Sequence, residues 1–213
     1  MSGRRWPFGG EGVGHEGSIG IGRSELRPRL GIEERASRAA HFYTDGASSI
    51  TSPVGSRTTG QAATSPQYLI DDEVLLGEIV NSLIAGASYA TELTGSSGDA
   101  LVRLHLHLRS AVATCQLQRS GARGRDGLWM QRVLGGSVTT DTMIVLEDFT
   151  GTAWSTRLRA ISFASQRLYQ AFGLPACPHL TEGGQVRWAH FADARNVRRD
   201  APNFDIELTT DVP

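Results

Sequence analysis

Lysine is absent from this chain of 213 residues, in which all 21 basic residues are arginines. Without a lysine amine there can be no Schiff base with a carbonyl substrate. The phosphate-binding loop that ends in Gly-Lys-Ser/Thr is excluded for the same reason. The 21 basic residues nearly balance the 22 acidic ones, and the net charge is −1. No overall field therefore attracts nucleic acid or an anionic membrane.

Cysteine is scarce as well. Cys115 and Cys177 are too few for a disulfide framework in a chain of this size, and they favour a reducing compartment. Long apolar runs are also missing, since none approaches the roughly 18 residues of a membrane span. The twin arginine in SGRRWPF is followed by glycine-rich sequence instead of the apolar segment of a signal peptide. We therefore expect a cytoplasmic protein that does not associate with a membrane.

The composition changes near residue 68. Residues 1–67 contain 12 of the 25 glycines and many small polar residues, which cannot bury enough apolar surface to offset chain entropy. We expect a mostly disordered leader over 1–67, with one or two helical turns around 32–43, and a folded domain over 68–211. A formal G-x-G-x-x-G stands at 12–17. No strand precedes it and no apolar helix follows it, so we do not interpret it as a dinucleotide site.

Two segments have the periodicity of amphipathic helices. In 71–95, apolar residues recur on one helical face, acidic residues begin the segment and Gly95 ends it. In 151–175 the pattern is clearer, and Gly173 and Pro175 close the helix. The apolar stripe of this second helix consists of Trp154, Leu158, Ile161, Ser165, Leu168 and Phe172. We expect both helices to cover a sheet.

Several strands are predicted around these helices. Residues 101–108 alternate apolar and polar side chains, and 111–119 either continue that strand after a bend or form its hairpin partner. Further strands are expected in 128–134, 142–149, 185–194 and 204–210. The predicted fold class is α+β: an antiparallel meander covered by two amphipathic helices and preceded by a disordered leader.

The alternating segment LVRLHLHLRS carries two histidines. His105 and His107 should point to the same side, about 6.5–7 Å apart. A zinc or iron site needs at least one more ligand, and the neighbours on that face, Arg103 and Arg109, repel a cation. A solvated or interface face is the leading interpretation, with a metal site and an anion-binding face as alternatives. We assign no metal or other cofactor to the chain.

Basic side chains cluster in and after this segment. If the strands pair as a meander, several of them could share one surface and contact phosphates. The aromatic residues of a base-stacking platform are scarce there, since Trp129 is the one nearby. The candidate polyanion-binding residues are Arg103, His105, His107, Arg109, Arg123 and Arg125.

Catalytic nucleophiles are poorly supported by the sequence. Cys115 stands in apolar surroundings, which raise a thiol pKa. Cys177 has His179 two residues on, whereas catalytic partners usually meet through the fold. No G-x-S-x-G elbow occurs. We interpret the acidic pairs at 71–72 and 147–148 as a helix start and a strand end, so no catalytic residue is assigned.

Two segments, DDEVLLGEIVNSLIAGASYATELTGSSGDALVRLHLHLRS and LRAISFASQRLYQAFGL, carry a resemblance. The order of a helix, a meander and a long covering helix that ends in AFG resembles the C-terminal region of actinobacterial proteins with a Schlafen/AlbA-like DNA-binding or ATP-binding N-terminal domain. The resemblance covers at most 69–211. Because that family's nucleic-acid or nucleotide function belongs to the N-terminal domain, the resemblance implies a detached accessory module and transfers no functional residue.

Three functions remain as hypotheses. The leading one is a non-catalytic intracellular accessory or interaction domain, with a protein partner or self-association through exposed strand edges. The second is weak nucleic-acid or polyanion binding through the arginine-rich sheet face. The third is a metal-dependent enzyme that uses His105 and His107.

Overall fold

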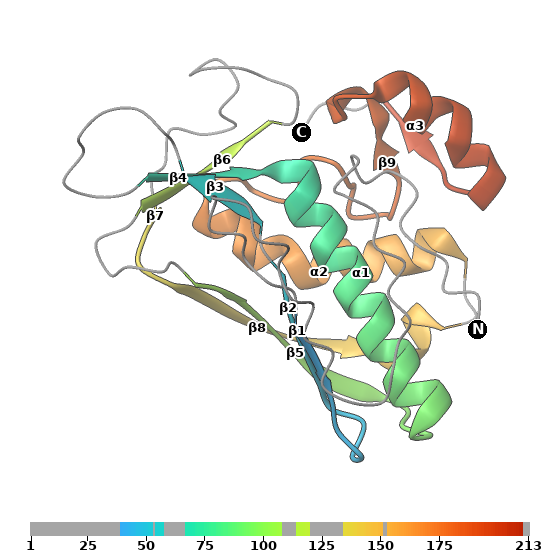
Figure 1. The fold of residues 1–213 in the computed structure, drawn as a ribbon. Helices are drawn as coiled ribbons and strands as arrows, with labels where there is room; N and C mark the ends of the chain where they lie inside the picture. The colour runs from blue at the N-terminus through green and yellow to red at the C-terminus, as the bar shows by residue number, and fades with distance from the viewer. Residues whose placement is uncertain are drawn as a thin grey trace, which may run out of the picture.

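The structure is a computed structural model that describes residues 39–52, 54–57, 67–107, 114–119, 134–150 and 153–210 (Figure 1). Helices and strands are mixed within these ranges, and the α+β class is confirmed. Two long helices, α1 (Asp72–Ser88) and α2 (Trp154–Ala171), cross one another at the centre, with α1 in front of α2 in Figure 1. The strands lie to the left and below them, and the C-terminal segment lies at the upper right.

An N-terminal hairpin packs against α1. Its strands are β1 (Ala39–Phe42) and β2 (Ser48–Thr51). The ring of Phe42 lies 4.7 Å from that of Tyr89, and the Tyr89 hydroxyl donates to the carbonyl of Tyr43 at 2.8 Å. The helical turns expected at 32–43 are therefore wrong for 39–42, which is extended because it pairs with β2. Regular structure begins before residue 68, and residues 1–38 lie outside the described residues.

A mixed sheet has the strand order β3-β4-β6-β7. Its strands are β3 (Gly55–Arg57), β4 (Gln67–Asp71), β6 (Thr114–Gln118) and β7 (Leu134–Gly135). β6 runs parallel to β4, and α1 lies in the crossover that a parallel pair requires. Consecutive residues Cys115, Gln116 and Leu117 are all buried, because this strand is covered on both faces.

A separate antiparallel ribbon is formed by β5 (Asp99–Leu106) and β8 (Val138–Val145). The alternation predicted for β5 is confirmed over the described residues: Leu106 is buried while Arg103 and His105 are exposed. Leu108 and Arg109 lie outside the described residues. The strand order departs from a simple meander. The strand that follows β5 in the chain, β6, pairs with β4, and the partner of β5 is the later strand β8.

Helix α1 begins where the acidic residues predict. The Asp71 carboxylate caps it by accepting from the backbone N–H groups of Glu73 and Val74, each at 3.1 Å. The helix continues as a π-helical turn (Tyr89–Leu93), and Gly95, at φ +69°, follows its end. By length and composition alone the stretch Asp72–Leu93 could cross a membrane. Half of its most apolar window is buried in the fold, and core helices of soluble proteins meet the same criterion.

Helix α2 matches its prediction closely. All six residues of the predicted stripe are buried against α1 and the strands, from Trp154 to Phe172. Ser165 is accommodated in this stripe because its hydroxyl donates to the carbonyl of Ile161 at 2.8 Å. Gly173, at φ +85°, lies beyond the helix end.

The C-terminal segment is mostly short helices and turns. Strands β9 (Val186–Arg187) and β10 (Leu208–Thr209) form a two-residue parallel pair, and α3 (Ala194–Asp200) lies between them in the chain. The strands expected at 185–194 and 204–210 are therefore wrong for most of their length. Phe204 belongs to a 3-10 turn, and Trp188–His190 forms another. Another 3-10 turn, Leu146–Phe149, follows β8.

Candidate functional site

The outward face of β5 and β8 contains the described part of the predicted polyanion site. Arg103 forms a bidentate pair with Asp141 on β8, with Nε–Oδ1 at 2.8 Å and Nη2–Oδ2 at 2.7 Å. This pair raises the pKa of Arg103 and lowers that of Asp141. The guanidinium charge of Arg103 is thus already matched by a carboxylate on the neighbouring strand.

The two histidines follow on the same face. Their rings stack at 5.9 Å with an interplanar angle of 22°. The Nδ1 atom of His105 lies 2.6 Å from the Thr139 hydroxyl, and that of His107 lies 3.1 Å from the Ser137 hydroxyl. Within the described ranges no cluster of three or more histidine, cysteine or acidic residues has metal-site geometry. Hydroxyl groups across the strands therefore hold the two imidazoles.

Arg109, Arg123 and Arg125 lie outside the described residues. The structure brings Arg103, His105 and His107 onto one face, and polyanion binding through the full set stays a prediction.

A buried titratable cluster was missed by the sequence reasoning. Asp72, the first residue of α1, lies next to His179 in the segment after α2, with Oδ2–Nε2 at 3.0 Å. Both side chains are fully buried. The ring of His190 meets that of His179 edge-on at 6.5 Å, and the Glu73 carboxylate accepts from the backbone N–H of Ala192. Acidic residues at the start of α1 thus hold the C-terminal segment.

The burial of this cluster determines its chemistry. Burial raises the pKa of Cys177 to about 11, so its thiol is protonated at neutral pH and is a poor nucleophile. Burial, followed by the charge of neighbouring His179, lowers the pKa of His190 to about 4 and keeps it neutral. Burial also raises the pKa of Glu73. The side chains of Asp72, His179 and Cys177 have no exposed surface, and the arrangement resembles a structural clamp.

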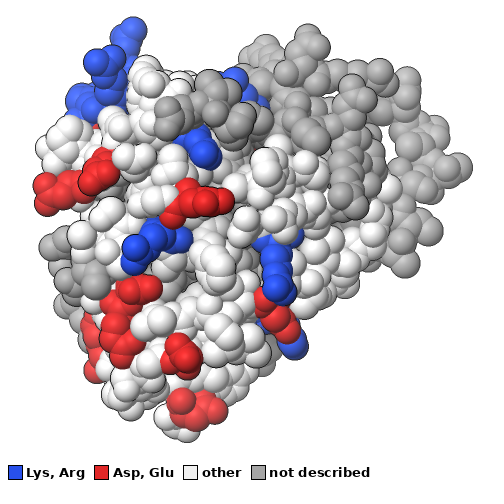
Figure 2. Space-filling model, turned by 180° about the vertical axis from the view of Figure 1, so that it is seen from behind, with Lys and Arg blue, Asp and Glu red and all other residues white. Residues whose placement is uncertain are grey.

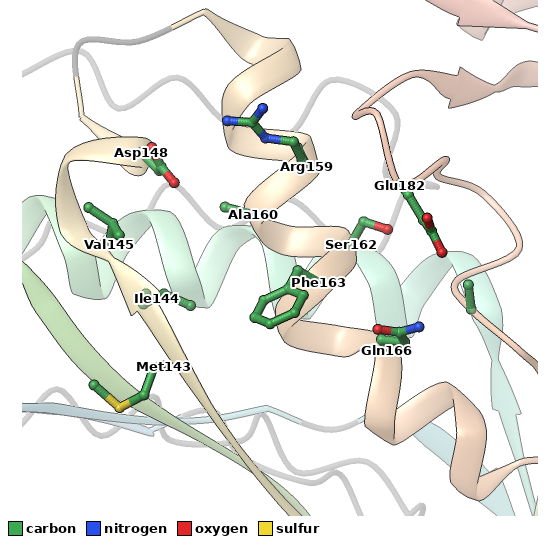
Figure 3. A pocket seen from close by; sticks show the side chains of 11 residues that line it. Met143, Ile144, Val145, Asp148, Arg159, Ala160, Ser162, Phe163, Gln166 and Glu182 are labelled. Carbon is green, nitrogen blue, oxygen red and sulfur yellow. The ribbon is translucent and has the colours of Figure 1, made fainter.

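An open groove lies on the side of the molecule away from α1. It encloses about 470 Å³ between β8, α2 and the segment after α2 (Figure 3). Its walls are formed by Met143, Ile144, Val145, Asp148, Arg159, Ala160, Ser162, Phe163, Gln166, Ala176 and Glu182. Asp148 and Arg159 lie towards one end in Figure 3, Gln166 and Glu182 towards the other, and Phe163 lies between them.

Large apolar side chains are exposed around this groove. Phe163 is 60% exposed, Met143 53% and Val145 41%. Leu101, the cross-strand neighbour of Met143, is 60% exposed. Figure 2 shows the molecule from this side, where uncharged residues lie among the acidic and basic groups. Exposed apolar side chains gathered around one groove mark an interaction site more often than scattered apolar residues do.

Phe163 was not singled out from the sequence, although a signal was present. Three of its four neighbours one turn away on α2, Arg159, Gln166 and Arg167, are polar, and the fourth is the small Ala160. An aromatic side chain therefore stands on the mostly polar face of the helix. Packing in the core does not explain such a residue.

No family model, curated protein or solved structure matches this chain. The site must therefore be interpreted from its own geometry.

Proposed function

We propose that this domain is a non-catalytic intracellular interaction module that binds a polypeptide partner in the groove between β8 and α2. The observation that carries the proposal is the exposure of Phe163, Met143 and Val145 around one hollow. Aromatic and methionine side chains are enriched at protein interfaces, where they fill pockets on the partner. The free, buried cysteines support a reducing, cytoplasmic location.

The enclosed cluster supports the same proposal. Asp72, His179 and Cys177 are the described residues whose chemistry comes closest to that of a catalytic site, and none of them has solvent exposure. A catalytic group must contact its substrate, so these residues fit a role in holding the fold together.

The proposal is tested by selecting unstructured peptides from a display library against the wild-type protein. The selected binders are then titrated against the Phe163→Ser variant and against Leu93→Ser, a matched control at an exposed apolar residue at the end of the π-helical turn that follows α1. Removing an aromatic residue at the centre of an interface should weaken binding about tenfold or more, and the control should change it little.

Two results would count against the proposal: no binder at all, or binders that Phe163→Ser does not affect. Sedimentation at increasing protein concentration provides a further check. A dimer that Phe163→Ser dissociates would assign the groove to a second copy of this chain in place of another partner.

A further inference from the structure

The outer edge of β8 faces the groove. The backbone N–H of Leu146 donates to the carbonyl of Gly98, just before β5, at 3.0 Å. Backbone groups of an antiparallel strand point to its two sides at alternate residues. In the register of this ribbon, even-numbered residues of β8 therefore bond to β5, and odd-numbered residues direct their N–H and C=O groups away from it.

A second contact confirms this assignment. The carbonyl oxygen of Asp141 accepts from Nη1 of Arg167 on α2 at 3.3 Å, so it points away from β5. Arg167 thus covers the edge at Asp141. At the next two odd positions, the N–H and C=O groups of Met143 and the N–H group of Val145 have no hydrogen-bond partner within the described part of the chain. The C=O group of Val145, the residue before the 3-10 turn Leu146–Phe149, accepts the first hydrogen bond of that turn.

These edge groups border the groove itself. Met143, Ile144 and Val145 all line it, although consecutive strand residues point to opposite faces. A hollow that meets three consecutive residues must run along the edge of the strand. It therefore combines apolar side chains with two backbone hydrogen-bonding positions about 7 Å apart, the spacing of one extended chain.

We infer that the partner binds as an added β-strand, pairing an extended, basic segment with β8 at Met143 and Val145. The inference rests on the proposed function and specifies the partner's backbone and charge. Main-chain hydrogen bonds to a free edge supply affinity, and pockets for alternate side chains supply specificity. One apolar side chain of the segment enters the groove beside Phe163 and Ala160.

The charge of the groove favours a basic segment. Its lining contains two carboxylates, Asp148 and Glu182, and one guanidinium, Arg159. A segment with an arginine or lysine next to its apolar residue matches this balance, because opposite charges across an interface favour association.

A second copy of the chain fits less well. If two β8 strands paired about a two-fold axis with Met143 opposite Val145, Asp141 of one copy would face Glu147 of the other. Like charges directly opposite one another destabilise a strand pair. The acidic groove linings would also approach one another.

The inference is tested with a short synthetic peptide in which valine alternates with arginine and threonine, titrated by fluorescence anisotropy. The matched protein variants are Met143→Pro and Met143→Ala. Proline removes an N–H that points away from β5, so the ribbon keeps its pairing, whereas alanine removes the side chain and retains the N–H. We expect the proline variant to weaken binding about tenfold, and about five times more than the alanine variant does.

If Met143→Pro does not fold, a second measurement on the wild-type protein still tests the inference. Methylating the peptide nitrogens at alternate residues blocks one edge of the peptide at a time. Methylation of one set should abolish binding. Methylation of the other set should leave the dissociation constant within about threefold of that of the unmethylated peptide. Replacing arginine by glutamate should also weaken binding.

Each contrary outcome is informative. Equal tolerance of both methylated sets, or no binding of the parent peptide up to about 1 mM, overturns the strand-pairing inference. If binders from the display library still depend on Phe163, the proposed function survives that result. If they do not, both proposals fail.

Discussion

Oδ2 of Asp72 lies 3.0 Å from Nε2 of His179, and both side chains are completely buried. The contact joins the first turn of α1 to the segment that follows α2. Removing one partner of a buried pair leaves the other without compensation in a medium of low dielectric constant. The contact therefore holds two distant parts of the chain together.

We expect Asp72→Ala to lower the free energy of unfolding by about 3–5 kcal/mol, measured by urea denaturation. The control is Asp71→Ala, which removes the adjacent helix cap and should cost about 1 kcal/mol. If Asp72→Ala costs no more than Asp71→Ala, the pair does not contribute as described. Combining Asp72→Ala with His179→Ala should cost less than the sum of the single changes.

His190 should make stability depend on pH. Its ordinary pKa of 6.5 is lowered to about 4 in the fold, so the unfolded chain binds the proton more readily. The contribution of neutral His190 to the free energy of unfolding is then fully present above pH 6.5. It falls by about 3 kcal/mol as the pH drops towards 4. The raised pKa of Glu73 acts in the opposite sense at the acidic end of this range.

The measurement compares wild type with His190→Gln by urea denaturation between pH 4.5 and 7.5. A glutamine side chain does not bind a proton in this pH range. The variant should therefore lose most of the slope of unfolding free energy against pH. Identical slopes in the two proteins would show that another group controls the dependence.

Elements with strong local periodicity could be predicted from the sequence. The stripe of α2 is a clear example, because a helix that covers a sheet needs apolar residues at helical spacing regardless of where the strands run. The alternation in β5 is another, since one face of the ribbon is buried and the other is wet.

Features that depend on long-range contacts could not be predicted. Strand β6 pairs in parallel with β4, and the composition of 111–119 does not indicate which strand will lie beside it. Asp72 looks like an ordinary helix-start residue until His179 is placed beside it. Phe163 is an intermediate case, since its position on the polar face of α2 is visible in the sequence but the groove beside it is not.

The alternative of polyanion binding leads to a separate prediction. Because Asp141 already matches the charge of Arg103, Arg103→Ala should change retention on a heparin column little. Asp141→Asn leaves the guanidinium unmatched and should increase retention, with a steeper dependence on salt. Loss of strong retention in Arg103→Ala would instead favour the sheet face as a polyanion site.

The turn that carries Glu182 depends on a close approach between backbones. Gly184 has φ +86°, and a Cβ atom there would lie 2.1 Å from the carbonyl oxygen of Ser155 in the first turn of α2. We expect Gly184→Ala to lower the free energy of unfolding by about 1–3 kcal/mol or more, since backbone atoms cannot move aside cheaply. Gly183→Ala is the matched control, because its nearest neighbour would be 3.7 Å away.

The same pair of variants tests whether this turn keeps the wall of the groove in place. Glu182 lies in the wall that this turn forms, so displacing the turn should weaken peptides selected on the groove, whereas Gly183→Ala should leave their affinity unchanged. Thermal denaturation and peptide titration on both variants measure the two effects. If Gly184→Ala is as stable as Gly183→Ala, the contact between this turn and α2 is looser than described, and Glu182 would be free to leave the groove.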